Sequence, residues 1–355
     1  MKIILLIILF LSLGGCYDYN EINDLAIIVG IGIDYKDDKY LITYEILSNN
    51  KDKESANISA YTVSASDKIL ANALDNTSDR IAKKAYYAHA DLVIISKEIA
   101  QNHFNEITDY LLRSNYIRDN FNIVIAEDPK KLLEEKQDNL PVISNSINET
   151  LAADLYSGAY SLDKEFADII REILTFGCDT TIPLVNVVND KIYLQGIALF
   201  DDYKMINTLN KNESAIFNII TNKSNKTTLT KEYDNKDFTI SILPSNIKIE
   251  VSKNKIIISG KANAKIINNE PNFFIKNSKT LNKIEKDFEQ ILNKKVKELI
   301  LKLQKNNTDA LFLAQKYYNK TKQKNDTLWL NANIESNIDI TVSKKGIIYE
   351  VQDAN

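Results

Sequence analysis

Few residues in this chain have the type and setting for acid–base or nucleophilic chemistry. Only two of the 355 residues are histidines, His89 and His103, and neither lies in a recognisable catalytic motif. The sequence contains no G-x-S-x-G, no H-E-x-x-H and no Walker A lysine loop. We therefore favour a structural role for His89. Carboxylates are abundant, so a paired-carboxylate hydrolase anchored in the envelope stays an open alternative, although no motif supports it.

One cysteine has a sequence context with a clear chemical meaning. Leu13-Gly14-Gly15-Cys16 follows Lys2 and an apolar run over residues 3–13, which is too short to span a bilayer. A leucine, two small residues and a cysteine resemble the lipobox of bacterial lipoproteins. We predict that residues 1–15 are a signal peptide and that Cys16 carries S-diacylglyceryl and N-acyl groups, which anchor the protein to a membrane. The alternative is an ordinary secretory signal with a chance cysteine.

Two other patterns that could mark cofactor sites are incomplete. Gly30-x-Gly32 lacks the third glycine of a dinucleotide fingerprint, and the next predicted element is a strand rather than a helix. Cys178 is the only other cysteine, and no Cys-x-x-Cys or Cys/His pattern accompanies it. We predict no metal and no cofactor. For Cys178 we favour packing at a helix end over a reactive or intermolecular thiol.

Composition restricts the class of protein further. Lysine and arginine number 44 against 48 aspartates and glutamates, so no global charge attracts nucleic acid, and we predict no nucleic-acid partner. Apolar residues make up 44% of the chain, which is enough for a packed core. No stretch other than the leader approaches the length of a transmembrane helix. Two or three domains fit this chain length.

Residues 25–190 are predicted to form a mixed α/β region that follows the tether at residues 16–24. Residues 25–34 and 39–48 are apolar runs joined by a polar turn, which is typical of a hairpin. Short apolar strands then alternate with helical periodicity, and Pro129 is well placed at the start of a helix. The further predicted strands cover residues 57–64, 91–96 and 121–126, and the helices cover residues 66–83, 97–113 and 163–176. Residues 139–161 are predicted to be irregular or weakly helical.

Residues 191–355 are predicted to form a C-terminal α+β domain. Strand patterns are dense from residue 227, and the long helix 278–305 carries an apolar stripe. We predict an antiparallel sheet with this helix over one face, because the strands need a second layer. The predicted strands cover residues 227–234, 237–243, 246–252, 255–267, 333–343 and 347–351. The fold class is therefore α+β, with each sheet covered by helices.

Several short motifs match a known family in order along the chain. Tyr17-Asp18-Tyr19-Asn20-Glu21-Ile22 follows Cys16 and leads to the strand end Gly30-x-Gly32-x-Asp34. The later matches are Asp109-x-Leu111-x-Arg113, Gly177-x-Asp179-x-x-x-Pro183, Gly196-x-Ala198-x-Phe200, Gln304, Asp309 and Trp329. On these motifs the chain resembles the GerC family, the lipoprotein C subunits of spore nutrient germinant receptors. It departs from the family at Tyr17, where tryptophan is usual, and at 310–313, where Gly-Phe-Gly is replaced.

The resemblance implies an elongated protein of three mixed α/β domains on the outer face of the spore inner membrane. It implies assembly with two multi-pass membrane subunits, to couple nutrient sensing to germination, and no enzymatic activity. Tyr17, Asp18 and Glu21 lie next to the anchor and are candidate partner contacts, with a plain tether as the alternative. A different class of function stays open, a lipid-anchored solute-binding protein of a transporter, which would hold a small ligand in a cleft.

Overall fold

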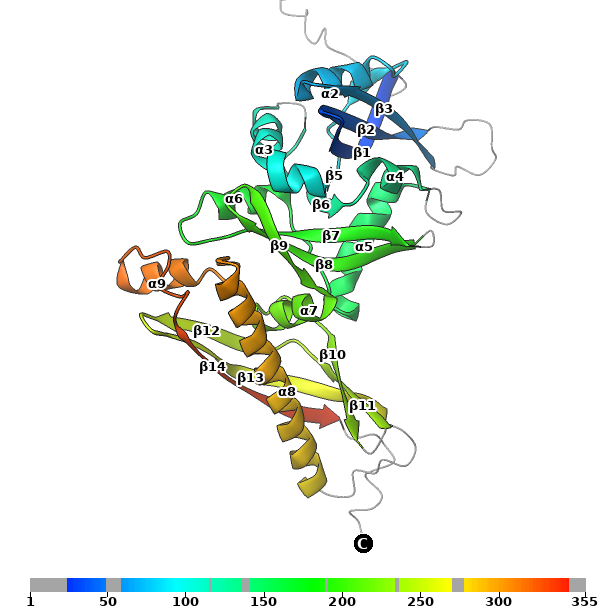
Figure 1. The fold of residues 1–355 in the computed structure, drawn as a ribbon. Helices are drawn as coiled ribbons and strands as arrows, with labels where there is room; N and C mark the ends of the chain where they lie inside the picture. The colour runs from blue at the N-terminus through cyan, green and yellow to red at the C-terminus, as the bar shows by residue number, and fades with distance from the viewer. Residues whose placement is uncertain are drawn as a thin grey trace, which may run out of the picture.

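The structure is a computed structural model in which two β-sheets follow one another along an elongated molecule (Figure 1). It describes residues 24–48, 59–114, 117–135, 141–188, 191–233, 236–269 and 278–344. The first sheet lies at the end that carries the N-terminal strands, and the second lies at the end that carries the long helix α8 (Ser278–Lys305). The two sheets and their covering helices confirm the predicted α+β class.

The first sheet combines antiparallel outer strands with a parallel centre. Its order is β3-β2-β1-β5-β6-β7-β8-β9, and β4 (Lys84–Tyr86) pairs separately with β1. β1 pairs antiparallel with β2 through the predicted hairpin, whereas β5, β6 and β7 continue parallel to it. The strands are β1 (Leu25–Lys36), β2 (Lys39–Ser48), β3 (Ser59–Asp67), β5 (Leu92–Ser96), β6 (Asn122–Ala126), β7 (Thr181–Val188), β8 (Lys191–Asp201) and β9 (Lys204–Asn210).

Helices cover both faces of the first sheet, which explains why its central strands are apolar without interruption. In β5, Val93 and Ile95 pack into one core, while Leu92 and Ile94 pack into the core on the opposite face. The first core is closed by α2 (Leu70–Ser78), α3 (Phe104–Arg113) and α6 (Phe166–Ile173). The second is closed by α4 (Pro129–Glu134) and α5 (Ile143–Ser157).

Local signals account for some helix boundaries, and tertiary contacts account for others. Pro129 begins α4 as predicted, and the Asp128 side chain caps this helix by accepting from the Lys131 backbone N–H. The predicted helix 97–113 divides into a π-helical turn, η2 (Ile99–His103), and α3. The prediction that Ser66 caps a helix was wrong, because Ser66 pairs with Leu41 within the β2–β3 ladder.

The second sheet and α8 enclose a separate core. Its order is β10-β11-β13-β12, in which β11 and β12 pair with different parts of the long strand β13. β14 also pairs with β13, over residues 255–265. The strands are β10 (Thr227–Tyr233), β11 (Lys236–Ile242), β12 (Asn246–Ser252), β13 (Lys255–Asn269) and β14 (Asn333–Lys344). The sheet is not wholly antiparallel as predicted, because β14 runs parallel to β13, which it reaches after the crossover through α8 and α9 (Leu313–Thr321). The predicted strand 347–351 lies outside the described residues.

The first sheet extends past residue 190, where we expected the C-terminal domain to begin. β7 and β8 pair as an antiparallel hairpin, and so do β8 and β9, so that both added strands continue the first sheet. Alternate side chains of β8 point to opposite faces of the strand and so contact the cores of both halves. Ala198 and Phe200 pack into the first sheet's core, whereas Ile197 and Leu199 pack into the core of the second sheet. This contact makes a broad junction between the sheets.

Candidate functional site at the junction of the two sheets

The residues predicted to anchor the chain and to contact partners lie outside the described residues. These are Cys16, Tyr17, Asp18 and Glu21. The structure instead brings several of the other motif residues together at the junction of the two sheets. The loop that holds Gly177, Cys178 and Asp179 faces the chain after α8, where Asp309 lies.

Asp179 and Asp309 join the two halves directly. The Asp179 carboxylate accepts from the Asp309 backbone N–H at 2.5 Å, and the Asp179 N–H donates to the Asp309 carbonyl at 3.3 Å. The Asp309 carboxylate in turn accepts from the backbone N–H groups of Leu313 and Ala314, each at 2.7 Å, and so holds the start of α9. Two segments 130 residues apart are thus locked by reciprocal bonds.

Close packing accompanies these bonds. Gly177 has φ +70°, a left-handed conformation that favours glycine, and a Cβ there would lie 2.6 Å from the Gln315 backbone nitrogen. Cys178 is buried beside it, and burial raises the pKa of its thiol to about 12. Because the thiolate is the nucleophilic form, this cysteine stays unreactive near neutral pH.

The two aspartates should make stability at the junction pH-dependent. Burial raises the pKa of Asp309 to about 7 and that of Asp179 to about 6, from an ordinary value of 3.8. Between about pH 4 and 7 the folded state therefore binds more protons than the unfolded state, and the free energy of unfolding falls as the pH rises. One group contributes at most about 1.4 kcal/mol per pH unit.

We expect Asp309→Asn to flatten this pH dependence. Urea unfolding at pH 5 and at pH 7 would show a smaller difference in the free energy of unfolding than in the wild type, by about 2 kcal/mol. The exposed Asp339 provides the matched control, Asp339→Asn, which should keep the wild-type slope. An unchanged slope in Asp309→Asn would contradict the assignment of this titration to the junction.

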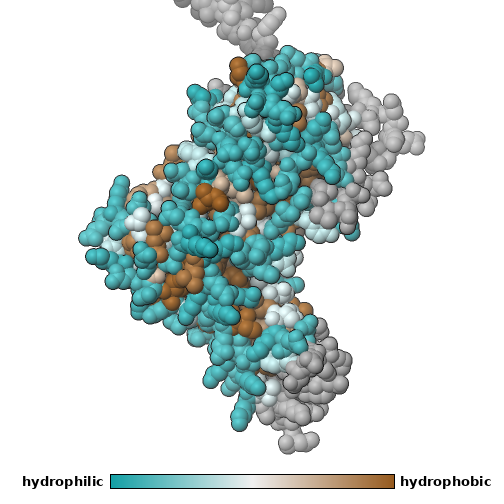
Figure 2. Space-filling view, viewed as in Figure 1, coloured by the Kyte–Doolittle hydropathy of each residue, from teal (hydrophilic) through white to brown (hydrophobic). Residues whose placement is uncertain are grey.

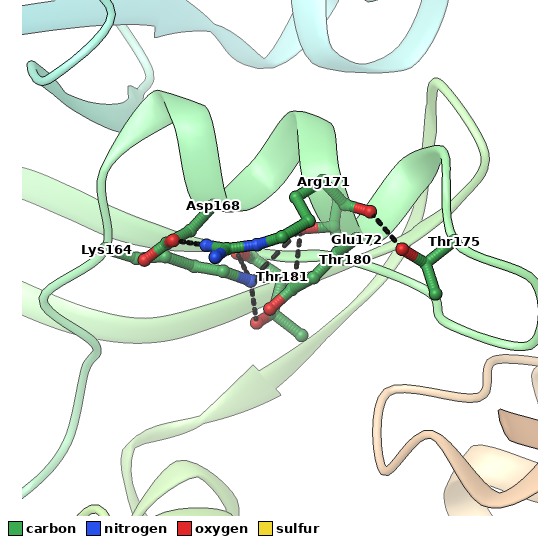
Figure 3. Close-up of polar contacts among 7 residues, drawn as sticks. All are labelled: Lys164, Asp168, Arg171, Glu172, Thr175, Thr180 and Thr181. Atoms are coloured by element: carbon green, nitrogen blue, oxygen red, sulfur yellow. Dashed lines mark hydrogen bonds and ion pairs between the residues drawn. The ribbon is translucent and has the colours of Figure 1, made fainter. Parts of the chain in front are cut away.

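A buried lysine forms the second polar element of the junction. Lys164 is 5% exposed, and its ammonium pairs with Glu172 of α6 and donates to Thr180 Oγ1 at 3.1 Å and to the Thr181 carbonyl at 3.2 Å. Figure 3 shows the Lys164 side chain extended alongside α6, with its ammonium pointing toward Glu172, Thr180 and Thr181. Thr180 also donates to Glu172 at 2.7 Å, so the three groups form a closed network.

The environment of Lys164 is costly for a charge. Burial lowers the pKa of Lys164 to about 8, and the Glu172 carboxylate opposes that effect. Sequence reasoning missed this residue. The available signal was a lysine placed between Leu162 and Phe166, both of which the structure buries. On the surface, Arg171 pairs instead with Asp168, so neighbouring charges of α6 divide between a solvent-exposed pair and a buried one (Figure 3).

A cavity of about 230 Å³ lies beside Lys164, between the sheets. Lys164, Glu172 and Lys316 are among the polar groups that line it, and Phe217 and Leu311 are among the apolar ones. Phe217 belongs to α7 (Lys211–Ile220), which lies between the sheets and contacts both the first sheet and α8. The cavity is therefore an interdomain space rather than a cleft within either sheet.

Further side-chain bonds tie α7 to both halves of the molecule. Asn218 is fully buried, and its amide donates to the carbonyls of Ala159 and Ser161 at 2.7 and 2.6 Å. Glu213, which completes the capping box of α7, pairs with Lys302 of α8 at 2.7 Å. These contacts join the end of the first sheet, α7 and α8 into one packed unit.

The glycines that suggested a dinucleotide site are covered by the chain itself. A Cβ on Gly30 would lie 1.9 Å from Ser144 Oγ, and Gly32 faces Pro129 and Leu133. The N-terminus of α5, which could otherwise hold an anion, receives the chain's own Glu45. Its carboxylate accepts from the backbone N–H groups of Ile143 and Ser144 at 2.7 and 2.9 Å. The place where a dinucleotide phosphate would bind, at the N-terminus of α5, is therefore filled by the Glu45 carboxylate.

The two histidines have different surroundings. His89 is exposed, with its ring 5.8 Å from that of Tyr86. His103 packs against the Tyr35 ring at 4.1 Å, and its Nδ1 lies 3.7 Å from the Glu106 carboxylate. Within the described ranges, no three His, Cys, Asp or Glu side chains are grouped as metal ligands. Among those same residues, no helix is long and apolar enough to cross a bilayer.

Comparisons with known proteins match almost the whole chain. The family model described as "Spore germination protein N-terminal domain" matches residues 18–187, and "Spore germination B3/ GerAC like, C-terminal" matches residues 195–348. Spore germination protein KC of Bacillus subtilis (strain 168) is 23% identical over 373 residues, which cover 90% of this chain and 88% of that protein. The putative spore germination protein YfkR of the same strain is 19% identical, over 87% of this chain and 85% of that protein.

A solved structure shares the fold. The crystal structure of the GerBC protein aligns with a TM-score of 0.55 at 16% identity, over 89% of this chain and 97% of that chain. The alignment therefore spans both sheets and the junction between them.

Proposed function

Because the chain belongs to the GerC family of spore germination proteins, we propose that it is a lipid-anchored, non-enzymatic subunit of a spore germinant receptor. In this proposal it assembles with two multi-pass membrane subunits on the outer face of the spore inner membrane and couples nutrient sensing to germination. One observation carries the proposal: the match to the family's N-terminal domain begins at residue 18, two residues after the predicted lipobox cysteine Cys16.

The junction supports a coupling role. Reciprocal bonds between Asp179 and Asp309 and the bridging helix α7 hold the two sheets as one packed unit. A force or displacement applied to one end of such an elongated unit is transmitted to the other, because packed interiors are hard to compress. A subunit that joins membrane proteins to one another needs this property.

One group and one position that could have served chemistry have structural roles instead, which supports a non-enzymatic role. Burial keeps the Cys178 thiol protonated, and Glu45 occupies the N-terminus of α5. Each is a group or a position that enzymes commonly use for nucleophiles or anions.

The substitution Cys16→Ala in the sporulating host tests the proposal. We expect the variant to leave the membrane fraction of spores, because the acyl chains that hold it there can no longer be attached. Germination through this receptor should then be lost or strongly slowed, as measured by the fall in optical density after nutrient addition. Cys178→Ala is the matched control and should leave both readouts unchanged. Normal membrane association and normal germination of Cys16→Ala spores would contradict the proposal.

A further inference from the structure

The tether limits which surface of the protein can face the lipid, if Cys16 is anchored as proposed above. Leu25, the first residue of β1, is nine residues from Cys16, so it lies at most about 30 Å from the anchor even with the chain fully extended. The elements next to Leu25 are therefore the part of the molecule held nearest the membrane. The second sheet lies at the opposite end (Figure 1).

The element beside Leu25 is β4, which pairs with the first residues of β1. The register places Lys84 opposite Leu25 and Tyr86 opposite Ile27. Lys84 and Tyr86 lie on the exposed face of β4, whereas Ala85 and Tyr87 alternate with them and pack against the core. An exposed lysine and an exposed tyrosine thus stand side by side at the base of the tether.

The segment that enters β4 carries three cations and no carboxylate. Residues 80–90 contain Arg80, Lys83 and Lys84 and no carboxylate, and all three cations are exposed. Neither Lys83 nor Lys84 forms an ion pair with any residue that the structure describes. Three exposed carboxylates, Asp24, Asp79 and Asp91, flank this surface, so the positive charge is confined to the segment itself.

This segment is held rigidly, unlike a loop that could turn away. Arg80 donates to the Ser64 carbonyl of β3 at 2.6 Å, and the Tyr87 hydroxyl bonds to Ser78 at 2.6 Å. The Tyr87 ring also packs edge-on against Tyr44, with ring centroids 5.6 Å apart. The cations and Tyr86 are therefore presented in a fixed arrangement. Figure 2 shows that this end of the molecule is mostly hydrophilic, with isolated hydrophobic side chains.

We propose that the surface formed by Arg80, Lys83, Lys84 and Tyr86 rests on the anionic lipid surface to which Cys16 is anchored. Lysine and arginine are attracted to acidic headgroups, and tyrosine is stable at the boundary between headgroups and acyl chains. The contact gives the anchored protein a defined orientation, in which the second sheet points away from the membrane. The inference rests on the proposed lipid anchor.

Site-directed labelling of the intact lipoprotein tests this orientation. The acylated chain carrying Tyr86→Cys is labelled with an environment-sensitive fluorophore and reconstituted in vesicles of phosphatidylcholine and phosphatidylglycerol. Cys178 remains in place, because a buried, protonated thiol labels poorly. The chain without the added cysteine measures that background. The control label is at the exposed position Lys253→Cys, in the turn between β12 and β13.

We expect brominated lipid to quench the label at position 86 roughly fivefold more than the label at position 253. Adding Lys83→Gln and Lys84→Gln should reduce this quenching, as should high salt. Equal quenching of the two labels would overturn the inference, and so would protection of position 86 only when the membrane subunits are present. Flotation of the vesicles separates the two proposals: a chain that does not float has no anchor, whereas one that floats with position 86 open to water lacks only this contact.

Discussion

Replacing Glu172 with glutamine is expected to lower the free energy of unfolding by about 3 kcal/mol at pH 7. Glutamine keeps the size of the side chain but removes the charge that pairs with Lys164. The ammonium would then stay buried with only neutral partners, Thr180 and Thr181. An uncompensated buried charge is among the few defects that cost this much. Urea unfolding followed by circular dichroism measures the effect.

The pH dependence of this variant identifies the cause. Burial already lowers the pKa of Lys164 to about 8, and loss of Glu172 removes the largest effect that opposes the decrease. The unfolded chain binds a proton that the folded chain lacks from the folded-state pKa up to about pH 10.5, so stability rises with pH across that window. The window begins at lower pH in Glu172→Gln, so its deficit should shrink as the pH rises toward 8 and stay constant above it.

A double variant provides the control for this network. Lys164→Met combined with Glu172→Leu removes both charges and should recover most of the lost stability, because apolar pairs often replace buried ion pairs without loss. Arg171→Gln breaks the exposed pair with Asp168 on the same helix and should change stability by less than about 1 kcal/mol. If Arg171→Gln and Glu172→Gln were equally mild, burial of the Lys164 charge would not be the source of the effect.

Replacing Asn293 with leucine is expected to destabilise the second half of the chain by about 3 kcal/mol. Asn293 projects from α8 onto the edge strand β14, where its amide donates to the Ile338 carbonyl at 3.0 Å and accepts from the Ile338 N–H at 2.9 Å. Ile338 is 1% exposed, so both backbone groups would lose their partner away from water. Trp329, the only tryptophan, is buried in the same core and reports unfolding by fluorescence.

Asn293 belongs to a series of contacts that protects this edge of the sheet. Glu289 accepts from the Ile340 N–H at 3.0 Å, and Glu285 accepts from the Val342 N–H at 2.8 Å. Three side chains spaced four residues apart on α8 thus meet alternate residues of β14. The spacings agree because four helical residues rise about 6 Å and two strand residues about 6.8 Å.

The edge contacts also predict a second effect of Asn293→Leu. Unpaired backbone groups on an edge strand are a template for another chain, so the variant should self-associate at high concentration, as sedimentation would show. Lys297→Leu, four residues further along α8 and exposed, is the matched control. A variant Asn293→Asp, which keeps the acceptor and loses the donor, should fall between the two. If Lys297→Leu were as destabilising as Asn293→Leu, the loss would not come from the β14 bonds.

The sequence by itself determined the elements whose signals are local. The hairpin of β1 and β2, the Pro129 start of α4 and the full extent of α8 follow from alternation, proline geometry and helical periodicity, and all three are present. The anchor at Cys16 also rests on local residues, since a lipobox requires no folded partner. It stays a prediction. The family motifs were visible for the same reason, as short runs of fixed spacing.

Only the tertiary structure decided which distant residues meet. The helix α5 has weak local signals and forms where its apolar residues cover the first sheet, with Glu45 at its N-terminus. The parallel direction of β14 depends on the path of α8 and α9 across the sheet. The junction depends on long-range packing, which places Asp179 against Asp309 and buries Lys164 with Glu172. Charge burial is a property of the neighbours that the fold supplies, so apolar residues near a lysine in the sequence do not by themselves establish it.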